Sequence, residues 1–193
     1  MARHICVILH GIECLPEDRL WSEELATRIY PHAAGLIEFL PRKYGYIPGW
    51  RVNYFSVYRS SIVDHEEAYF KALRADVGPD CNISVICHSL GGYIVSELLQ
   101  RGLKFHRVIS LYAAAPQNTD WTTVENNFDR IYVWWSKNDE ILPQSRFGKI
   151  GLVGPLRQHP RVVSIKTQHR HTTFMDDHEM YKLIPTWVKE LEE

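Results

Sequence analysis

The sequence predicts an α/β protein whose core is a mostly parallel six-stranded sheet with helices on both faces. Six short runs of β-branched and aromatic residues recur along the chain, and several are apolar throughout instead of alternating. Continuous apolar runs are typical of strands that are covered on both faces, as in a parallel sheet. Segments with helical periodicity separate these runs, which favours right-handed strand–helix–strand connections. The length of 193 residues indicates a single domain over 1–193.

The six runs are HICVILH, WRVNYFSVY, NISVICH, RVISLYA, RIYVWWS and RVVSIKT, which predict strands at residues 4–10, 50–58, 82–88, 107–113, 130–136 and 161–167. In an open sheet of this kind, reactive groups gather where the parallel strands end. The residues that follow each run are therefore the first place to look for chemistry.

The predicted helices lie at residues 16–30, 64–76, 90–102 and 178–193. The first opens with acidic residues, which suit the positive end of a helix dipole. Gly78 and Pro79 form a stop signal after the second, and Gly102 is a typical C-terminal residue for the third. Pro185 predicts either a kink or a new helix start within the last segment.

Charge and composition exclude several classes of partner. Lys and Arg number 22 and Asp and Glu 23, so the net charge of -1 gives no reason to expect nucleic acid or a polybasic membrane contact. The apolar run near the N-terminus is too short for a signal-peptide core or a membrane span, which predicts a soluble, cytoplasmic protein. In that compartment the four cysteines are expected to be buried thiols. Oligomeric state is not encoded in these patterns.

The segment CHSLGG, residues 87–92, joins a predicted strand directly to a predicted helix. It fits the nucleophile-elbow pattern G-x-S-x-G with Ser89 at its centre, except that Cys87 replaces the first glycine. Such a turn strains the backbone of its central residue, exposes the serine oxygen and aims the N–H of Leu90 at an oxygen that becomes negative. The alternative interpretation is that Ser89 is only a helix N-cap.

A nucleophilic serine needs a base and an acid that orients the base, and in this architecture they follow the serine in the order acid, then histidine. Asp139 comes just beyond the strand predicted at 130–136. Glu140 is the alternative acid, although its side chain points the other way on an extended segment. The strand predicted at 161–167 is followed by His169, His171 and His178 as possible bases.

The sequence resembles the α/β-hydrolase superfamily in four segments that follow in the family's order, VILHGIE, VICHSLGGY, WWSKNDEILP and HRHTTFMDD, at residues 7–13, 85–93, 134–143 and 169–177. The resemblance implies a minimal form of that fold, similar in size to the compact bacterial lipases. The spacer after residue 113 is short, so no large cap domain is expected.

The resemblance further implies a serine esterase with a catalytic triad of Ser89, Asp139 and His171 that acts on a small or medium acyl ester. His169 remains a competitor for the base. The oxyanion hole would use the backbone N–H groups of Ile12 and Leu90. The mechanism needs no cofactor and no metal.

Other interpretations of the same residues stay open. A thioesterase or an amidase would use the same triad, and the fold also serves as a binding module without turnover. A nucleotide-binding domain is disfavoured, because no G-x-G-x-x-G or G-x-x-x-x-G-K-[ST] pattern follows any strand.

Several further side chains have a structural interpretation. His10 is expected to brace its loop, and His88 to pack in the elbow. The acids and histidines at 169–178 lack a recognised metal-ligand spacing. Candidates for lining an acyl pocket or cleft are Cys14, Trp21, Tyr44, Tyr46, Ile47 and Trp50.

Overall fold

A computed structural model describes residues 3–11, 21–33, 35–42 and 52–189 of the chain, with the backbone alone over 52–57. Its strands are β1 (His4–Leu9), β2 (Ile37–Arg42), β3 (Asn82–His88), β4 (Phe105–Leu111), β5 (Phe128–Trp135) and β6 (Val162–Lys166). Its α-helices are α1 (Trp21–Ile29), α2 (Val52–Val77), α3 (Leu90–Gln100), α4 (Ile150–Val153) and α5 (His178–Lys189). Short 3₁₀ helices include η1 (Tyr30–His32) and η6 (Thr173–Asp176).

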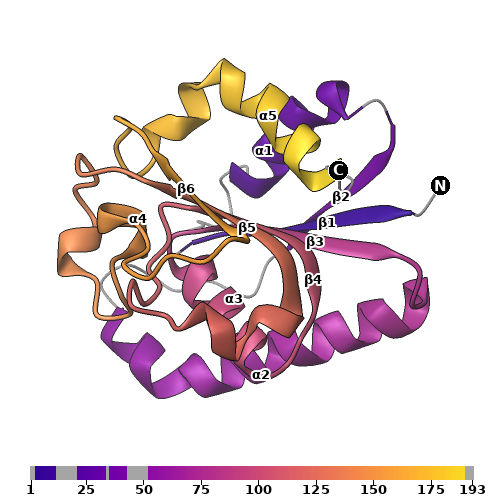
Figure 1. The fold of residues 1–193 in the computed structure, drawn as a ribbon, viewed down its shortest axis with the longest axis horizontal. Helices are drawn as coiled ribbons and strands as arrows, with labels where there is room; N and C mark the ends of the chain where they lie inside the picture. Colours follow the sequence, from indigo (N-terminus) through magenta and orange to yellow (C-terminus); the bar gives the residue numbers. More distant parts are fainter. Residues whose placement is uncertain (1–2, 12–20, 34, 43–51, 190–193) are drawn as a thin grey trace.

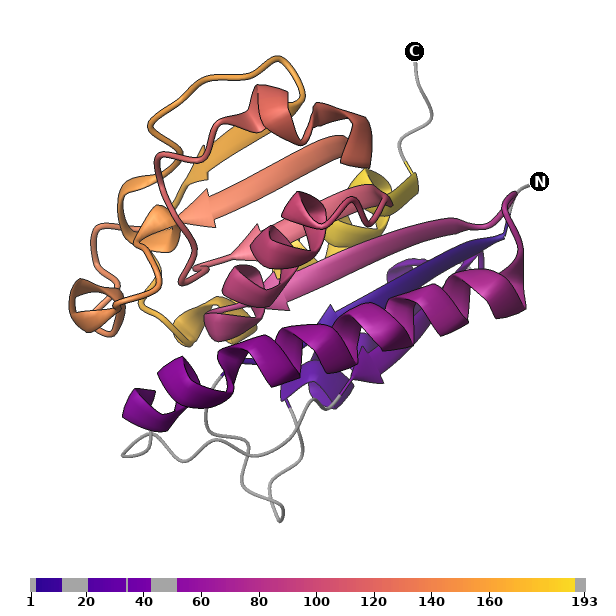
Figure 2. The same ribbon diagram turned by 90° about the horizontal axis from the view of Figure 1, so that it is seen from below.

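The strands described here form a six-stranded sheet in the order β2-β1-β3-β4-β5-β6, and every neighbouring pair is parallel. The C-terminal ends of the strands therefore share one edge (Figures 1 and 2). The register sets Leu9 beside Cys87 and Cys87 beside Ser110, so the ends of three strands are level there. This architecture confirms the predicted α/β fold class with a parallel sheet.

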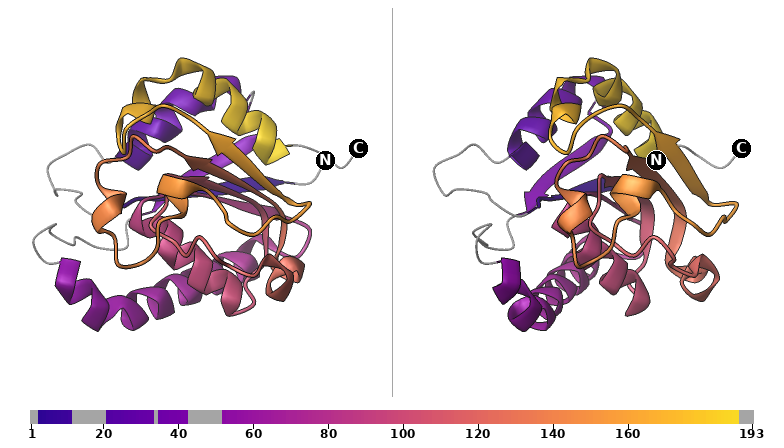
Figure 3. Two further views of the ribbon diagram at one scale, coloured as in Figure 1. Left: turned by 60° about the vertical axis from the view of Figure 1, so that its left-hand side comes forward. Right: turned by 90° about the vertical axis from the view of Figure 1, so that its left-hand side faces the viewer.

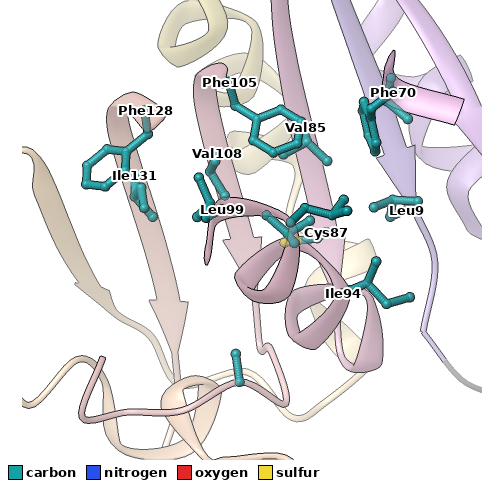
Figure 4. Packing of buried hydrophobic residues seen from close by; sticks show 14 of the residues in the cluster. Leu9, Phe70, Val85, Cys87, Ile94, Leu99, Phe105, Val108, Phe128 and Ile131 are labelled. Carbon is teal, nitrogen blue, oxygen red and sulfur yellow. The ribbon is translucent and has the colours of Figure 1, made fainter. Parts of the chain in front are cut away.

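Helices cover both faces of the sheet (Figures 1 and 3), with α1 and α5 on one side and α2 and α3 on the other. Strand alternation divides the core between them, because Ile5, Val7 and Leu9 of β1 face one layer while Cys6 and Ile8 face the other. Figure 4 shows the first layer, in which side chains of α2 and α3 pack on β3, β4 and β5.

The strand predicted at 50–58 is wrong, because residues 52–77 form the long helix α2. The run of β-branched and aromatic residues there precedes the predicted helix at 64–76 with no Gly or Pro between them, so nothing stops the helix from continuing toward the N-terminus. The helix ends at Val77, where Gly78 adopts a φ of 82° as the stop signal predicted.

The missing strand is β2, which the sequence analysis did not identify. It contains Pro41, which cannot donate a ladder hydrogen bond, and proline is confined to edge strands for that reason. In the sheet β2 is an edge strand beside β1. An ion pair between the buried carboxylate of Glu66 and the partly exposed guanidinium of Arg42 ties β2 to α2. Both carboxylate oxygens accept hydrogen bonds from the guanidinium, at 3.0 and 3.1 Å.

The remaining predicted strands and the predicted helices all have counterparts; the helix predicted at 64–76 is the C-terminal half of α2, and the ends of the others that lie in the described residues differ by a few residues. Pro185 lies inside α5, and the helix continues from His178 to Lys189 across it. The predicted ends of the first and last helices, 16–20 and 190–193, lie outside the described residues. No helix in the described ranges has both the length and the apolar content that a membrane span requires.

Candidate active site

Ser89 lies between β3 and α3 in a strained backbone conformation, with φ of 51° and ψ of -121°. Its N–H donates to the carbonyl oxygen of Leu111, and its own carbonyl oxygen accepts from Gly92 and Ala114 at 3.0 and 2.8 Å. Although Ser89 occupies the N-cap position of α3, its side chain makes no capping hydrogen bond. The hydroxyl is therefore not used as a helix cap, which was the structural alternative.

The two glycines after the serine are required by close packing. A Cβ on Gly91 would lie 2.8 Å from the carbonyl oxygen of His10, and one on Gly92 would lie 2.2 Å from the Cβ of Ala113. The start of α3 therefore sits directly on the ends of the neighbouring strands. Only residues without side chains allow a turn this tight at the strand end.

Cys87, the departure from the elbow pattern, is accommodated on the other face of the sheet from His88. Its side chain is 1% exposed and lines a cavity of about 30 Å³ together with Ser110 and Trp121. Burial raises the pKa of the Cys87 thiol to about 12, while a hydrogen bond with Ser110 acts in the opposite direction. The thiol is thus protonated at neutral pH and serves as a small packing group.

The loop after β1 passes directly over Ser89. A Cβ on Gly11 would lie 2.8 Å from the Cβ of Ser89 and 3.4 Å from its Oγ. The His10 ring braces this loop through a 2.5 Å hydrogen bond between its Nδ1 and the carbonyl oxygen of Gly11. Ile12, the expected oxyanion-hole residue in this loop, lies outside the described residues.

Leu90, the other expected oxyanion-hole residue, is the first residue of α3 and is fully buried. N–H groups in the first turn of a helix have no intrahelical acceptor and carry the positive end of the helix dipole. The Leu90 N–H is therefore suited to bind a negatively charged oxygen beside Ser89.

Asp139 lies beyond the end of β5 and is 2% exposed. Its Oδ1 accepts hydrogen bonds from the N–H groups of Ile141 and Leu142, at 3.0 and 2.9 Å. Its Oδ2 accepts a 2.7 Å hydrogen bond from Nδ1–H of His171. These three donors compensate a carboxylate that is removed from water.

His171, which follows β6, is 5% exposed and is the histidine that the fold brings to Asp139. Because the carboxylate can only accept, the proton sits on Nδ1, and Nε2 keeps the lone pair that a general base needs. His169 pairs instead with Asp177, at 3.0 Å. Glu140 does not reach the imidazole but accepts from the backbone N–H of His171 at 3.3 Å.

His88 precedes Ser89 in the chain, and its ring contacts the His171 ring at 4.7 Å between centroids. Within the described part of the chain, no hydrogen bond joins Ser89 Oγ to His171. Both residues keep a small exposed fraction, 8% for Ser89 and 5% for His171. In enzymes without bound substrate the hydrogen bond between nucleophile and base is often long, and it shortens in the substrate complex.

His88 is buried in the elbow, as predicted from the sequence. Burial and the neighbouring His171 lower the pKa of His88 to about 3. The hydrogen-bond partner of His88 is the carbonyl oxygen of His171, 2.9 Å from Nε2. The sequence did not reveal this partner, because the two residues are 83 positions apart along the chain. The contact of Glu140 with His171 was missed for the same reason.

Trp21, the one described member of the proposed pocket lining, makes edge contacts with the rings of His88 and Phe174. Cys14, Tyr44, Tyr46, Ile47 and Trp50 lie outside the described residues. Among the side chains that the structure describes, no group of three or more His, Cys, Asp or Glu residues is arranged to hold a metal ion.

Comparison with solved structures supports the architecture. The chain is similar to a candidate hydrolase of the α/β superfamily from Xanthomonas campestris, with a TM-score of 0.59, 10% identity and coverage of 94% of this chain and 98% of that one. An esterase from Pyrococcus furiosus, Pf2001, has a TM-score of 0.62 and 13% identity, with coverage of 97% and 83%. A monoacylglycerol lipase from Paleococcus ferrophilus has a TM-score of 0.60 and 13% identity, with coverage of 95% and 93%.

No protein-family model and no curated protein sequence matches this chain. The structural likeness extends over nearly the whole chain, and it establishes the α/β-hydrolase fold with no large cap domain evident among the described residues.

Proposed function

We propose that this protein is a serine esterase that hydrolyses carboxylic esters of small or medium acyl groups through an acyl-enzyme intermediate. The observation that carries the proposal is the 2.7 Å hydrogen bond between His171 Nδ1 and Asp139, beside an elbow serine whose hydroxyl caps no helix. An esterase and a lipase among the similar structures agree with it.

In the proposed reaction Ser89 Oγ attacks the ester carbonyl carbon while its proton passes to Nε2 of His171. Asp139 holds the imidazole in the required tautomer and stabilises the imidazolium. The tetrahedral oxyanion binds the N–H of Leu90 and, by the resemblance to α/β hydrolases, that of Ile12. A single donor of this kind is worth about 3 kcal/mol.

The intermediate collapses when the alkoxide leaves and takes the proton from His171. Water then attacks the acyl-serine carbonyl, gives its proton to His171, and the carboxylic acid departs as Ser89 recovers its proton. The chain supplies every group in this sequence, so the proposal names no cofactor and no metal.

The test is turnover of p-nitrophenyl esters by matched variants. Ser89→Ala and His171→Ala are each expected to lower kcat by roughly 10⁶-fold. His169→Ala is the control, because His169 is paired with Asp177 and not with Asp139. Near-wild-type turnover by Ser89→Ala would exclude the mechanism. If His169→Ala lost turnover and His171→Ala did not, the general base would be His169 in place of His171, and the rest of the mechanism would stand.

The leaving group is open to a separate experiment. A thioesterase or an amidase would use the same three side chains, so acyl-CoA thioesters and anilides are run beside a series of p-nitrophenyl esters of increasing chain length. The proposal expects the highest kcat/KM on esters of short or medium acyl chains.

A further inference from the structure

His88 is the last residue of β3 and is covalently joined to Ser89. Because side chains alternate along a strand, its ring projects to the face opposite Cys87. There it lies 5.2 Å from Trp21, 5.0 Å from Phe174 and 4.7 Å from His171, measured between ring centroids. The residue is 6% exposed.

Within this packing the ring makes a directed bond. His88 Nε2 lies 2.9 Å from the carbonyl oxygen of His171. A carbonyl oxygen can only accept, so Nε2 carries the proton and Nδ1 carries the lone pair. Nδ1 is buried and has no hydrogen-bond partner among the residues that the structure describes, which agrees with a neutral ring whose single proton is committed to His171.

His171 is thus held at three points. Asp139 fixes its ring nitrogen, Glu140 accepts from its backbone N–H, and His88 donates to its carbonyl oxygen. Asp139 and Glu140 both belong to the loop after β5. His88 belongs to β3, the strand that leads into Ser89. Among the described residues, its bond alone joins His171 directly to the neighbour of the nucleophile.

We infer that His88 is a positioning residue, whose hydrogen bond to the His171 carbonyl oxygen sets the place of the imidazole relative to Ser89. The inference rests on the proposed function. It assigns to the residue before the nucleophile a directed bond, beyond its packing in the elbow.

The electrostatic state of His88 suits this task. Burial keeps the ring uncharged at neutral pH, because the pKa of His88 is lowered to about 3. A neutral ring does not compete with His171 for the proton of Ser89. It also does not repel the imidazolium that forms at His171, which a cation at the same distance would destabilise.

A matched pair of variants separates the hydrogen bond from the packing. His88→Gln places an amide N–H near the position of Nε2, whereas His88→Met has nearly the same size and no donor. Misplacing a catalytic group by about 1 Å costs on the order of 10²-fold in rate. The methionine variant is therefore expected to lose about 10- to 100-fold in kcat with KM nearly unchanged, and the glutamine variant to stay within about threefold of wild type.

A second background shows whether the effect passes through His171. In His171→Ala protein there is no imidazole to position, so His88→Met and His88→Gln are expected to have equal residual turnover. A methionine-specific loss that persists in this background would mean that His88 acts on the Ser89 turn itself, which would overturn the inference. So would equal losses, or no loss, in both variants of the otherwise wild-type enzyme.

A readout that needs no turnover separates this inference from the proposed function. The low-field proton resonance of His171 Nδ1–H, hydrogen-bonded to Asp139, is expected to persist in His88→Gln and to broaden in His88→Met. If the resonance behaves in this way but the wild type hydrolyses no ester, the esterase proposal is wrong and the positioning role of His88 still stands. If the methionine variant does not fold, the test rests on the glutamine variant alone. A tenfold loss of kcat in His88→Gln, with an unchanged unfolding midpoint, would contradict the positioning role of the hydrogen bond.

Discussion

Replacing Asp139 with asparagine changes one atom, and the hydrogen bonds of the site determine how the new amide must orient. Asp139 Oδ1 accepts from two backbone N–H groups, those of Ile141 and Leu142, and Oδ2 accepts from His171. An asparagine that keeps its oxygen at the Oδ1 position keeps both backbone bonds. The reverse orientation would aim an NH₂ group at two N–H donors, at a cost of about 1–3 kcal/mol for each unsatisfied group.

The favoured orientation places the asparagine NH₂ against His171 Nδ1. That nitrogen must then accept, so the imidazole proton moves to Nε2, and Nε2 can no longer take the proton of Ser89. Loss of the correct tautomer costs about 10⁴ in kcat in a comparable triad. At 1.36 kcal/mol per factor of ten, this is roughly 5 kcal/mol of transition-state stabilisation.

The neighbouring Asp–His pair provides a control with the same chemistry. Asp177 accepts from His169 through Oδ2 and from the N–H groups of Glu179 and Met180 through Oδ1. Asparagine is as good an N-cap as aspartate, so Asp177→Asn is expected to preserve stability and turnover. The assay is p-nitrophenyl butyrate hydrolysis by both variants after circular dichroism has verified folding. A kcat for Asp139→Asn within tenfold of the control would refute the tautomer argument.

Other predictions concern stability and reactivity. Glu66→Gln removes the carboxylate charge that pairs with the partly exposed Arg42 guanidinium and is expected to lower the free energy of unfolding in urea by about 2 kcal/mol; a change below about 0.5 kcal/mol would contradict a structural role for the pair. Gly92→Ala forces a Cβ to within 2.2 Å of Ala113 and is expected to destabilise by about 1–3 kcal/mol and to lower turnover, with an unchanged melting temperature as the contrary result. Unfolding exposes His88 with a pKa near 6.5 against about 3 in the fold, so the unfolded chain binds more protons in this window, and stability falls as pH drops below 6.5. Between pH 7 and pH 5 wild type should lose about 2 kcal/mol more than His88→Gln, and parallel pH curves would argue against a buried neutral ring. Cys87, with a pKa near 12, should resist iodoacetamide at pH 8 in the folded protein, and rapid alkylation there would contradict its burial.

The sequence specified the elbow well because its constraints are local. The strand at 82–88, the turn at Ser89 and the helix that follows all have strong patterns within a few residues, and each was predicted where the structure has it. The two glycines are explained equally locally, by the closeness of the adjacent strand ends.

The edge of the sheet was harder because tertiary context decides it. Residues 37–42 include a proline and two charged residues, which argue against a strand until the edge position beside β1 is known. Residues 52–58 have high strand propensity, yet their connection without a break to a strongly helical segment makes them helical.

Choosing between His169 and His171 also required three dimensions. The two histidines are separated by one residue and each has an aspartate partner, so spacing alone could not decide which pairs with Asp139. The bond from His88 to the His171 backbone was beyond sequence reasoning entirely, because main-chain acceptors leave no pattern in the side chains.

The most direct test of the proposed chemistry is covalent labelling with a fluorophosphonate probe, read by mass spectrometry of the digested protein. The account predicts a single adduct on Ser89 in the folded wild type and strongly slowed labelling in His171→Ala, with His169→Ala labelled at the wild-type rate. A folded wild type that takes up no probe at Ser89 would contradict it.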